Sequence, residues 1–192
     1  MIEPVITAVP ADPARQLRLR RIRLFSLVLA RCFVVLAILL TIGLLFYWLS
    51  VSASSIAADA QIPQEWLSEL GLGRRLVGFA ISFVPLACLV FALMAARRCF
   101  GAFASGNFFG QGAISNLRYF GLGLLASALL KPVSAAALSV LLSWDAPAGQ
   151  HRLTLGLDSD TMLTLLAACI VAVITWVMAE ASALAEENAQ FI

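Results

Sequence analysis

Four long apolar segments separated by polar ones dominate the hydropathy pattern of the chain. They cover residues 32–50, 76–96, 119–142 and 162–179. Each is close to the about 20 residues that a helix needs to cross the hydrocarbon core of a bilayer. We therefore predict an all-α protein, a bundle of four transmembrane helices that forms one integral membrane domain over residues 1–192.

The first helix is expected to begin well before its apolar segment. Asp12 followed by Pro13 is a favourable N-cap and first-turn pair, so the arginine-rich residues 13–31 should be helical and continuous with the span. The basic flank, the apolar run and the small residues after it also imitate a cleavable signal peptide. Because the run is long for a signal peptide, we favour an uncleaved span, which an intact-mass measurement would test.

Composition supports the bilayer as the solvent of this chain. Hydrophobic residues make up 61% of it and charged residues 12%, with a mean hydropathy of +0.94. Soluble domains have about 45–50% apolar and about 25% charged residues. The cysteines lie in or beside the apolar segments without a CxxC pair, which is typical of reduced packing residues.

The distribution of arginines predicts the orientation. Nine basic residues lie near the spans on the side that carries the N-terminal extension 1–31, the connection 97–118 and the tail 180–192, against three on the other side. Cytoplasmic segments carry the excess of basic residues in membrane proteins. We therefore expect both termini in the cytoplasm of a bacterium and the helices in its inner membrane.

Lys131 is the only lysine and lies near the centre of the third apolar segment, directly before Pro132. An intramembrane charge costs about 2.5–3.5 kcal/mol or more unless it is paired or hydrated, so it is a candidate functional residue. No acidic residue lies at a matching depth in the predicted spans, so hydroxyls, the carbonyls freed by Pro132, a lipid headgroup or water are the expected partners. Ser127 lies one turn earlier on the same face, among small residues that favour helix packing. Lys131 is either a packing residue, part of an ion or substrate pathway, or a contact to lipid or a partner.

The motifs of common enzyme classes are missing from the sequence. It contains no glycine-rich phosphate loop, no nucleophile elbow and no HExxH motif, and His151 is its single histidine. We therefore expect no enzymatic activity, no metal and no cofactor. The arginines beside the first span are expected to contact lipid headgroups and not nucleic acid.

Two segments on the predicted cytoplasmic side carry a family resemblance. Ser105–Phe108 and Asn116–Gly121 form the first, and Met178–Ala181 with Ala185–Ile192 form the second. With these motifs the chain resembles the bacterial integral membrane family called Domain of Unknown Function 2975. The resemblance implies no established activity. Because members are often encoded beside a small helix-turn-helix regulator of the Cro type, it also implies a membrane partner that senses a signal and restrains or informs that regulator.

A cytoplasmic regulator would dock on the aromatic connection and the acidic tail. The docking candidates, which share this predicted side, are Phe108, Phe109, Arg118, Glu186, Glu187 and Asn188. The carboxylates could also form ion pairs with the arginines there, each worth about 0–1 kcal/mol. We expect a non-enzymatic sensor or antagonist of the regulator. The alternatives are a small transport or channel component that uses Lys131 and a structural subunit of a membrane complex. A second copy of the chain is a further candidate partner.

Overall fold

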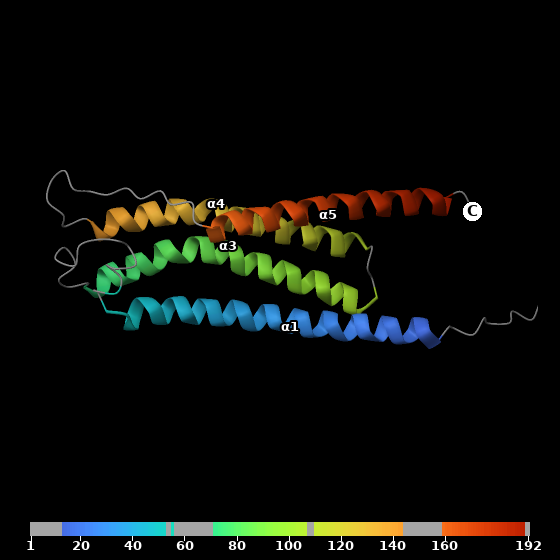
Figure 1. Ribbon diagram of the computed structural model, residues 1–192, viewed down its shortest axis with the longest axis horizontal. Helices are drawn as coiled ribbons and strands as arrows, with labels where there is room; N and C mark the ends of the chain where they lie inside the picture. The colour runs from blue at the N-terminus through green and yellow to red at the C-terminus, as the bar shows by residue number, and fades with distance from the viewer. Residues whose placement is uncertain (1–12, 53–54, 56–70, 107–109, 144–158, 191–192) are drawn as a thin grey trace, which may run out of the picture.

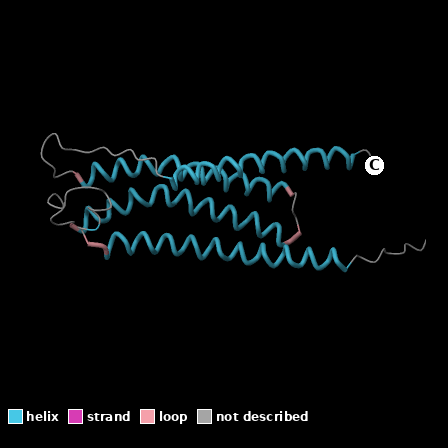
Figure 2. Tube along the Cα trace, in the orientation of Figure 1, coloured by secondary structure: helices cyan, strands magenta, loops and turns pink. Residues whose placement is uncertain are grey.

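A computed structural model of the chain describes residues 13–52, 55, 71–106, 110–143 and 159–190, with only the backbone for 13–19, 22, 185–186 and 188–190. In this part of the chain four helices follow one another: α1 (Pro13–Ser50), α3 (Leu72–Ala104), α4 (Gln111–Leu142) and α5 (Ser159–Gln190). They run alternately in opposite directions (Figure 1). No strand occurs among the described residues (Figure 2).

Each helix contains one of the predicted spans, so the prediction of an all-α, four-helix protein is confirmed. The stretches Arg23–Ser50, Leu72–Ala104, Gln111–Leu142 and Ser159–Leu184 are long and apolar enough to cross a membrane. The first helix begins at Pro13, as predicted. Its basic extension and its apolar segment therefore form one continuous rod.

The predicted connection at 97–118 is mostly helical. α3 continues to Ala104, where the backbone N–H groups of Ser105 and Gly106 bond back to the carbonyls of Gly101 and Phe103. Gly106 then adopts a φ of +87°, a conformation that glycine takes without steric cost and that ends a helix. α4 resumes at Gln111. Arg97 and Arg98, which directly follow the predicted second span, thus lie within α3.

The helices pack mainly on their neighbours in the chain. The extensive contacts join α1 to α3, α3 to α4 and α4 to α5, which makes α1 and α5 the outer helices of the row. In Figure 1, α1, α3 and α4 lie one above another, and α5 overlaps α4 over part of its length. α5 therefore leaves large apolar side chains uncovered, such as Trp176, which is 76% exposed. In a bilayer such surfaces face lipid or another protein.

Two glycines allow the central helices to approach closely. Gly78 of α3 lies directly against the indole of Trp48 in α1, and Trp48 is only 3% exposed. The Trp48 indole N–H donates to the Ser82 hydroxyl at 3.2 Å. On the other side of α3, a Cβ added to Gly123 of α4 would lie 2.8 Å from the Cβ of Ala92. A larger residue at either glycine would push the helices apart.

Arg75, from the first turn of α3, closes the end of α1. Its Nη1 donates to the carbonyl oxygens of Trp48 at 2.9 Å, Leu49 at 3.2 Å and Val51 at 3.0 Å. The last carbonyls of a helix lack intrahelical donors, and the negative end of the helix dipole attracts a cation. Arg75 therefore links α1 to α3 by supplying a cap that α1 does not contain.

The two outer helices extend beyond the inner ones at the end where the chain begins and stops, which we call the terminal end (Figure 1). The ring of Phe33 in α1 lies 5.6 Å from that of Phe100 in α3. From this contact α1 runs back to Pro13, whereas α3 ends at Ala104. At about 1.5 Å per residue, α1 projects about 24 Å past α3.

Candidate functional site

The intramembrane candidate Lys131 has an acidic partner. Its Nζ forms an ion pair and hydrogen bond with Oδ2 of Asp160 in α5. The expectation that no acid lies at a matching depth is therefore wrong. α5 begins at Ser159, before the predicted fourth span, and this brings Asp160 into the helix. The Lys131 and Asp160 side chains are 42% and 72% exposed, so the pair lies at the protein surface.

The ion pair lies deep along α4. Lys131 is 11 residues before the last residue of α4, Leu142. This corresponds to about 16 Å along the helix axis, or about half of a 30 Å hydrocarbon core. The first turn of α5 consequently starts well short of the far end of α4, as Figure 1 shows.

Asp160 is placed where a carboxylate is favoured. It is the acidic residue in the first turn of α5, at which backbone N–H groups lack intrahelical acceptors and the helix dipole is positive. The hydroxyl of Thr164 donates to the Asp160 carbonyl at 2.8 Å. The Asp160 side chain can therefore be stabilised by Lys131 and by the start of its own helix together.

Ser127 and Pro132, which the sequence analysis considered together with Lys131, lie beside it on α4. Ser127 is buried one turn earlier. Pro132 is inside the helix, where its missing N–H leaves the carbonyl of Ala128 without its helical donor. α4 continues through both positions, so the proline does not end the helix.

Of the six docking candidates, the structure describes the side chains of two. Phe108 and Phe109 lie outside the described residues, and of Glu186 and Asn188 only the backbone in α5 is described. The two candidates with described side chains are both exposed: Glu187 near the end of α5 and Arg118 on α4.

Arg118 and Glu187 lie far apart along the helix axes. Gly121 of α4 faces Val171 of α5, with its added Cβ 3.2 Å from the Val171 Cγ1. Arg118 is three residues from this contact and Glu187 is sixteen, both toward the terminal end. At about 1.5 Å per residue they are separated by about 20 Å. The structure thus does not bring these two residues together as an ion pair.

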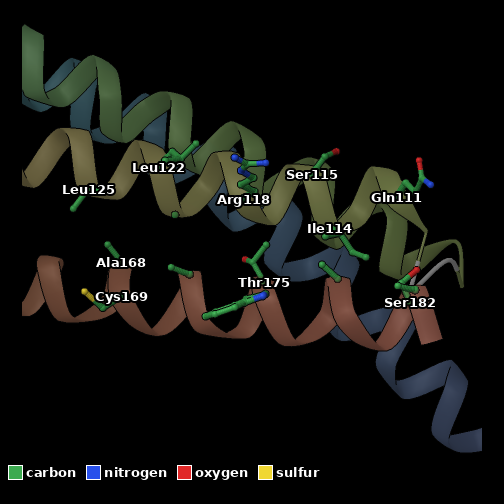
Figure 3. Close-up of a pocket in the computed structure, with 15 residues that line it drawn as sticks. Gln111, Ile114, Ser115, Arg118, Leu122, Leu125, Ala168, Cys169, Thr175 and Ser182 are labelled. Carbon is green, nitrogen blue, oxygen red and sulfur yellow. The ribbon is translucent and has the colours of Figure 1, made fainter. Parts of the chain in front are cut away.

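A groove between α4 and α5 is a feature that the sequence did not indicate. It encloses about 680 Å³ and opens at the surface between the two helices (Figure 3). Its lining from α4 consists of Gln111, Ile114, Ser115, Arg118, Gly121, Leu122 and Leu125. The lining from α5 consists of Ala168, Cys169, Ala172, Thr175, Trp176, Ala179, Ser182 and Ala183.

The two ends of this α4–α5 groove differ in polarity. Gln111 and Ser115 line the part at the terminal end, with Ser182 on the opposite helix, and Arg118 lies near the middle of the groove opposite Thr175 (Figure 3). Beyond Arg118, toward the middle of α4, the lining is apolar. Thr175 does not alter this, because its hydroxyl donates to the carbonyl of Val171 in its own helix at 2.7 Å. The α4 positions repeat every three or four residues, which marks one helix face, but sequence cannot show that α5 leaves a space there.

Metal-binding chemistry finds no support in the described ranges. There, no three His, Cys, Asp or Glu side chains are close enough together to hold an ion. The cysteines Cys32, Cys88, Cys99 and Cys169 are free thiols.

Length and composition of the four helices indicate a multi-pass α-helical membrane protein. Residues 52–192 match the model of the family described as protein of unknown function (DUF2975), and the chain belongs to this family. The match confirms the resemblance carried by the two terminal-end motifs. It includes α3, α4 and α5, and it begins after α1. No curated protein and no solved structure matches the chain.

Proposed function

We propose that this protein is a non-enzymatic, multi-pass protein of the bacterial inner membrane that acts as a sensor or antagonist of a cytoplasmic helix-turn-helix regulator. The observation that carries the proposal is the projection of α1 and α5 past the inner helices at the terminal end (Figure 1). The excess of arginines on that side supports a cytoplasmic location for it. Two projecting helices offer a soluble partner a surface that lies outside the bilayer.

The projecting segments carry opposite charges. α1 exposes Arg20, Arg21 and Arg23, whereas α5 exposes Glu187 on its projecting end and Glu180 at the level where α4 begins. A partner that contacts both helices would meet a basic surface on one side and an acidic surface on the other. Complementary charge patterns of this kind steer association and fix the orientation of a complex.

Binding of the regulator provides the direct test. The full chain in detergent is expected to retain a purified helix-turn-helix regulator of the Cro type, and a neighbouring gene for such a protein would supply the probe. A chain lacking Glu186–Ile192 should lose it, and a chain in which a glycine-serine segment of equal length replaces these residues should lose it too. The second variant controls for tail length. If the full chain does not retain the regulator, the proposal is overturned.

A transport or channel role is the second candidate, and the Lys131–Asp160 pair favours it. Charged residues within a membrane commonly line water-filled or substrate pathways, and this pair is partly exposed at the depth of a span. Exchange of Lys131 for methionine tests the idea. Unchanged stability and an unchanged cellular phenotype would exclude a pathway that uses this lysine.

A further inference from the structure

We infer that the α4–α5 groove binds one anionic phospholipid from the membrane leaflet at the terminal end. This inference goes beyond the proposed function and does not depend on a regulator. It rests on three properties of the groove: its length, the order of its polar and apolar parts, and the position of Arg118.

The groove covers the headgroup layer and part of one leaflet. Its α4 lining extends from Gln111 to Leu125 and its α5 lining from Ala168 to Ala183, about 21–23 Å at about 1.5 Å per residue. Arg118 lies halfway along the α4 lining, so with Arg118 at the headgroups about 10 Å of the groove extends into a hydrocarbon layer that is about 15 Å deep in one leaflet. The volume of about 680 Å³ also falls within the range of about 300–1,000 Å³ that is usual for ligand pockets.

The order of polar and apolar groups follows that of a phospholipid. Gln111 can donate its side-chain amide hydrogens to headgroup oxygens at the terminal end, and Leu122 and Leu125 present hydrocarbon toward the middle of α4 (Figure 3). A soluble polar ligand would leave the apolar part uncovered. A hydrocarbon chain alone would leave the polar part unused.

Arg118 lies at the depth of the headgroups. Because Gly123 of α4 faces Ala92 of α3, Arg118 and Arg97 are each five residues from this contact toward the terminal end. Two arginines at one level mark the interfacial layer, where basic side chains meet phosphate. Arg118 is exposed, and within the described part of the chain it makes no hydrogen bond or ion pair. Its guanidinium can therefore bind a lipid phosphate with two N–H groups.

Small side chains create the space for the acyl chain. Gly121 touches Val171 at the floor of the groove, with its added Cβ only 3.2 Å from Val171 Cγ1. Ala168 and Ala172 on the same side of α5 contribute only methyl groups. The close contact brings the two backbones together, and the alanines beside it leave a channel that larger residues would fill.

Lipid binding can be measured by native mass spectrometry of the full chain released from detergent. The probes are phosphatidylglycerol, which is anionic, and phosphatidylcholine, which is zwitterionic. The wild-type chain is expected to retain one phosphatidylglycerol in preference to phosphatidylcholine. Arg118→Gln should weaken this binding at least about tenfold, because it removes the charge-assisted hydrogen bonds to the phosphate. Arg97→Gln is the matched control and should keep the preference.

A variant that fills the groove distinguishes lipid binding in the groove from lipid binding on the remaining surface. Ala172→Trp should reduce retention of both lipids, with folding checked by its thermal unfolding temperature. Equal losses in Arg118→Gln and Arg97→Gln would overturn the inference, because they would show general attraction of anionic lipid. A dimer that Ala172→Trp dissociates would also overturn it and would identify a second copy as the occupant.

Discussion

The ammonium group of Lys131 on α4 is paired with the carboxylate of Asp160 in the first turn of α5. The pair joins two residues that are 29 positions apart in the chain. A nearby opposite charge reduces the free energy cost of placing either residue in the membrane. Because the other α4–α5 contacts are largely apolar and could slide, this pair also determines the depth at which α5 begins. We infer that this ion pair fixes the position of α5 along α4.

Removal of one partner from this pair should destabilise the protein. Asp160→Asn removes the carboxylate that neutralises the lysine charge, and we expect a loss of about 2–3 kcal/mol in the free energy of unfolding. Lys131→Met should cost less, because the N-terminus of α5 still stabilises the Asp160 carboxylate. Thermal or denaturant unfolding in one detergent would rank the two variants.

The double variant Lys131→Met with Asp160→Asn serves as the control for this ranking. Since it removes both charges, it should recover much of the stability that Asp160→Asn loses. Strictly additive losses in the double variant would show that the two side chains do not interact in the membrane.

Replacement of Arg75 should loosen the end of α1. Arg75→Gln removes the guanidinium that donates to the carbonyls of Trp48, Leu49 and Val51. We expect faster amide hydrogen exchange over residues 47–51 and a loss of about 1–3 kcal/mol, the cost of leaving charged-group hydrogen bonds unmade. Arg75→Lys keeps the charge but not the planar fork, so its effect should be intermediate. Unchanged exchange in Arg75→Gln would contradict the capping role.

A glycine-to-alanine substitution should have opposite effects at two positions, one inside the close contact of α3 with α4 and one outside it. Gly123→Ala places a methyl group 2.8 Å from the Cβ of Ala92, and such overpacking costs about 1–3 kcal/mol. Gly43→Ala in α1 meets nothing within 4 Å, and alanine is the better helix former by about 1 kcal/mol. The unfolding temperature should fall for the first variant and hold or rise for the second. A rise for both would place α4 farther from α3.

Orientation can be tested with reporters fused to the C-terminus. Fluorescent protein folds and fluoresces in the bacterial cytoplasm, whereas alkaline phosphatase is active only outside it, where its disulfides form. The arginine distribution predicts a fluorescent C-terminal fusion and an inactive phosphatase fusion. The opposite pair of results would remove the cytoplasmic docking surface from the proposed function.

Several features of the site could not be predicted because helix ends are poorly defined by hydropathy. The predicted fourth span began at Met162, the first of its apolar residues, and this excluded Asp160 from the membrane segment. Arg75 was counted only as a charge outside the second span, yet it caps a different helix. In both cases the partner of the polar residue lies on another helix, and hydropathy does not reveal such a partner.

The sequence alone predicted the number of spans, the helical class and the start of α1 at Pro13. Each of these depends on local properties, namely the length of an apolar run, its average hydropathy and the residues at its end. The partner of Lys131, the stagger of α5 and the α4–α5 groove depended on tertiary structure. Hydropathy tells which residues favour lipid over water, but the relative depth of two helices is set by contacts such as the Lys131–Asp160 ion pair, which joins residues far apart in the sequence.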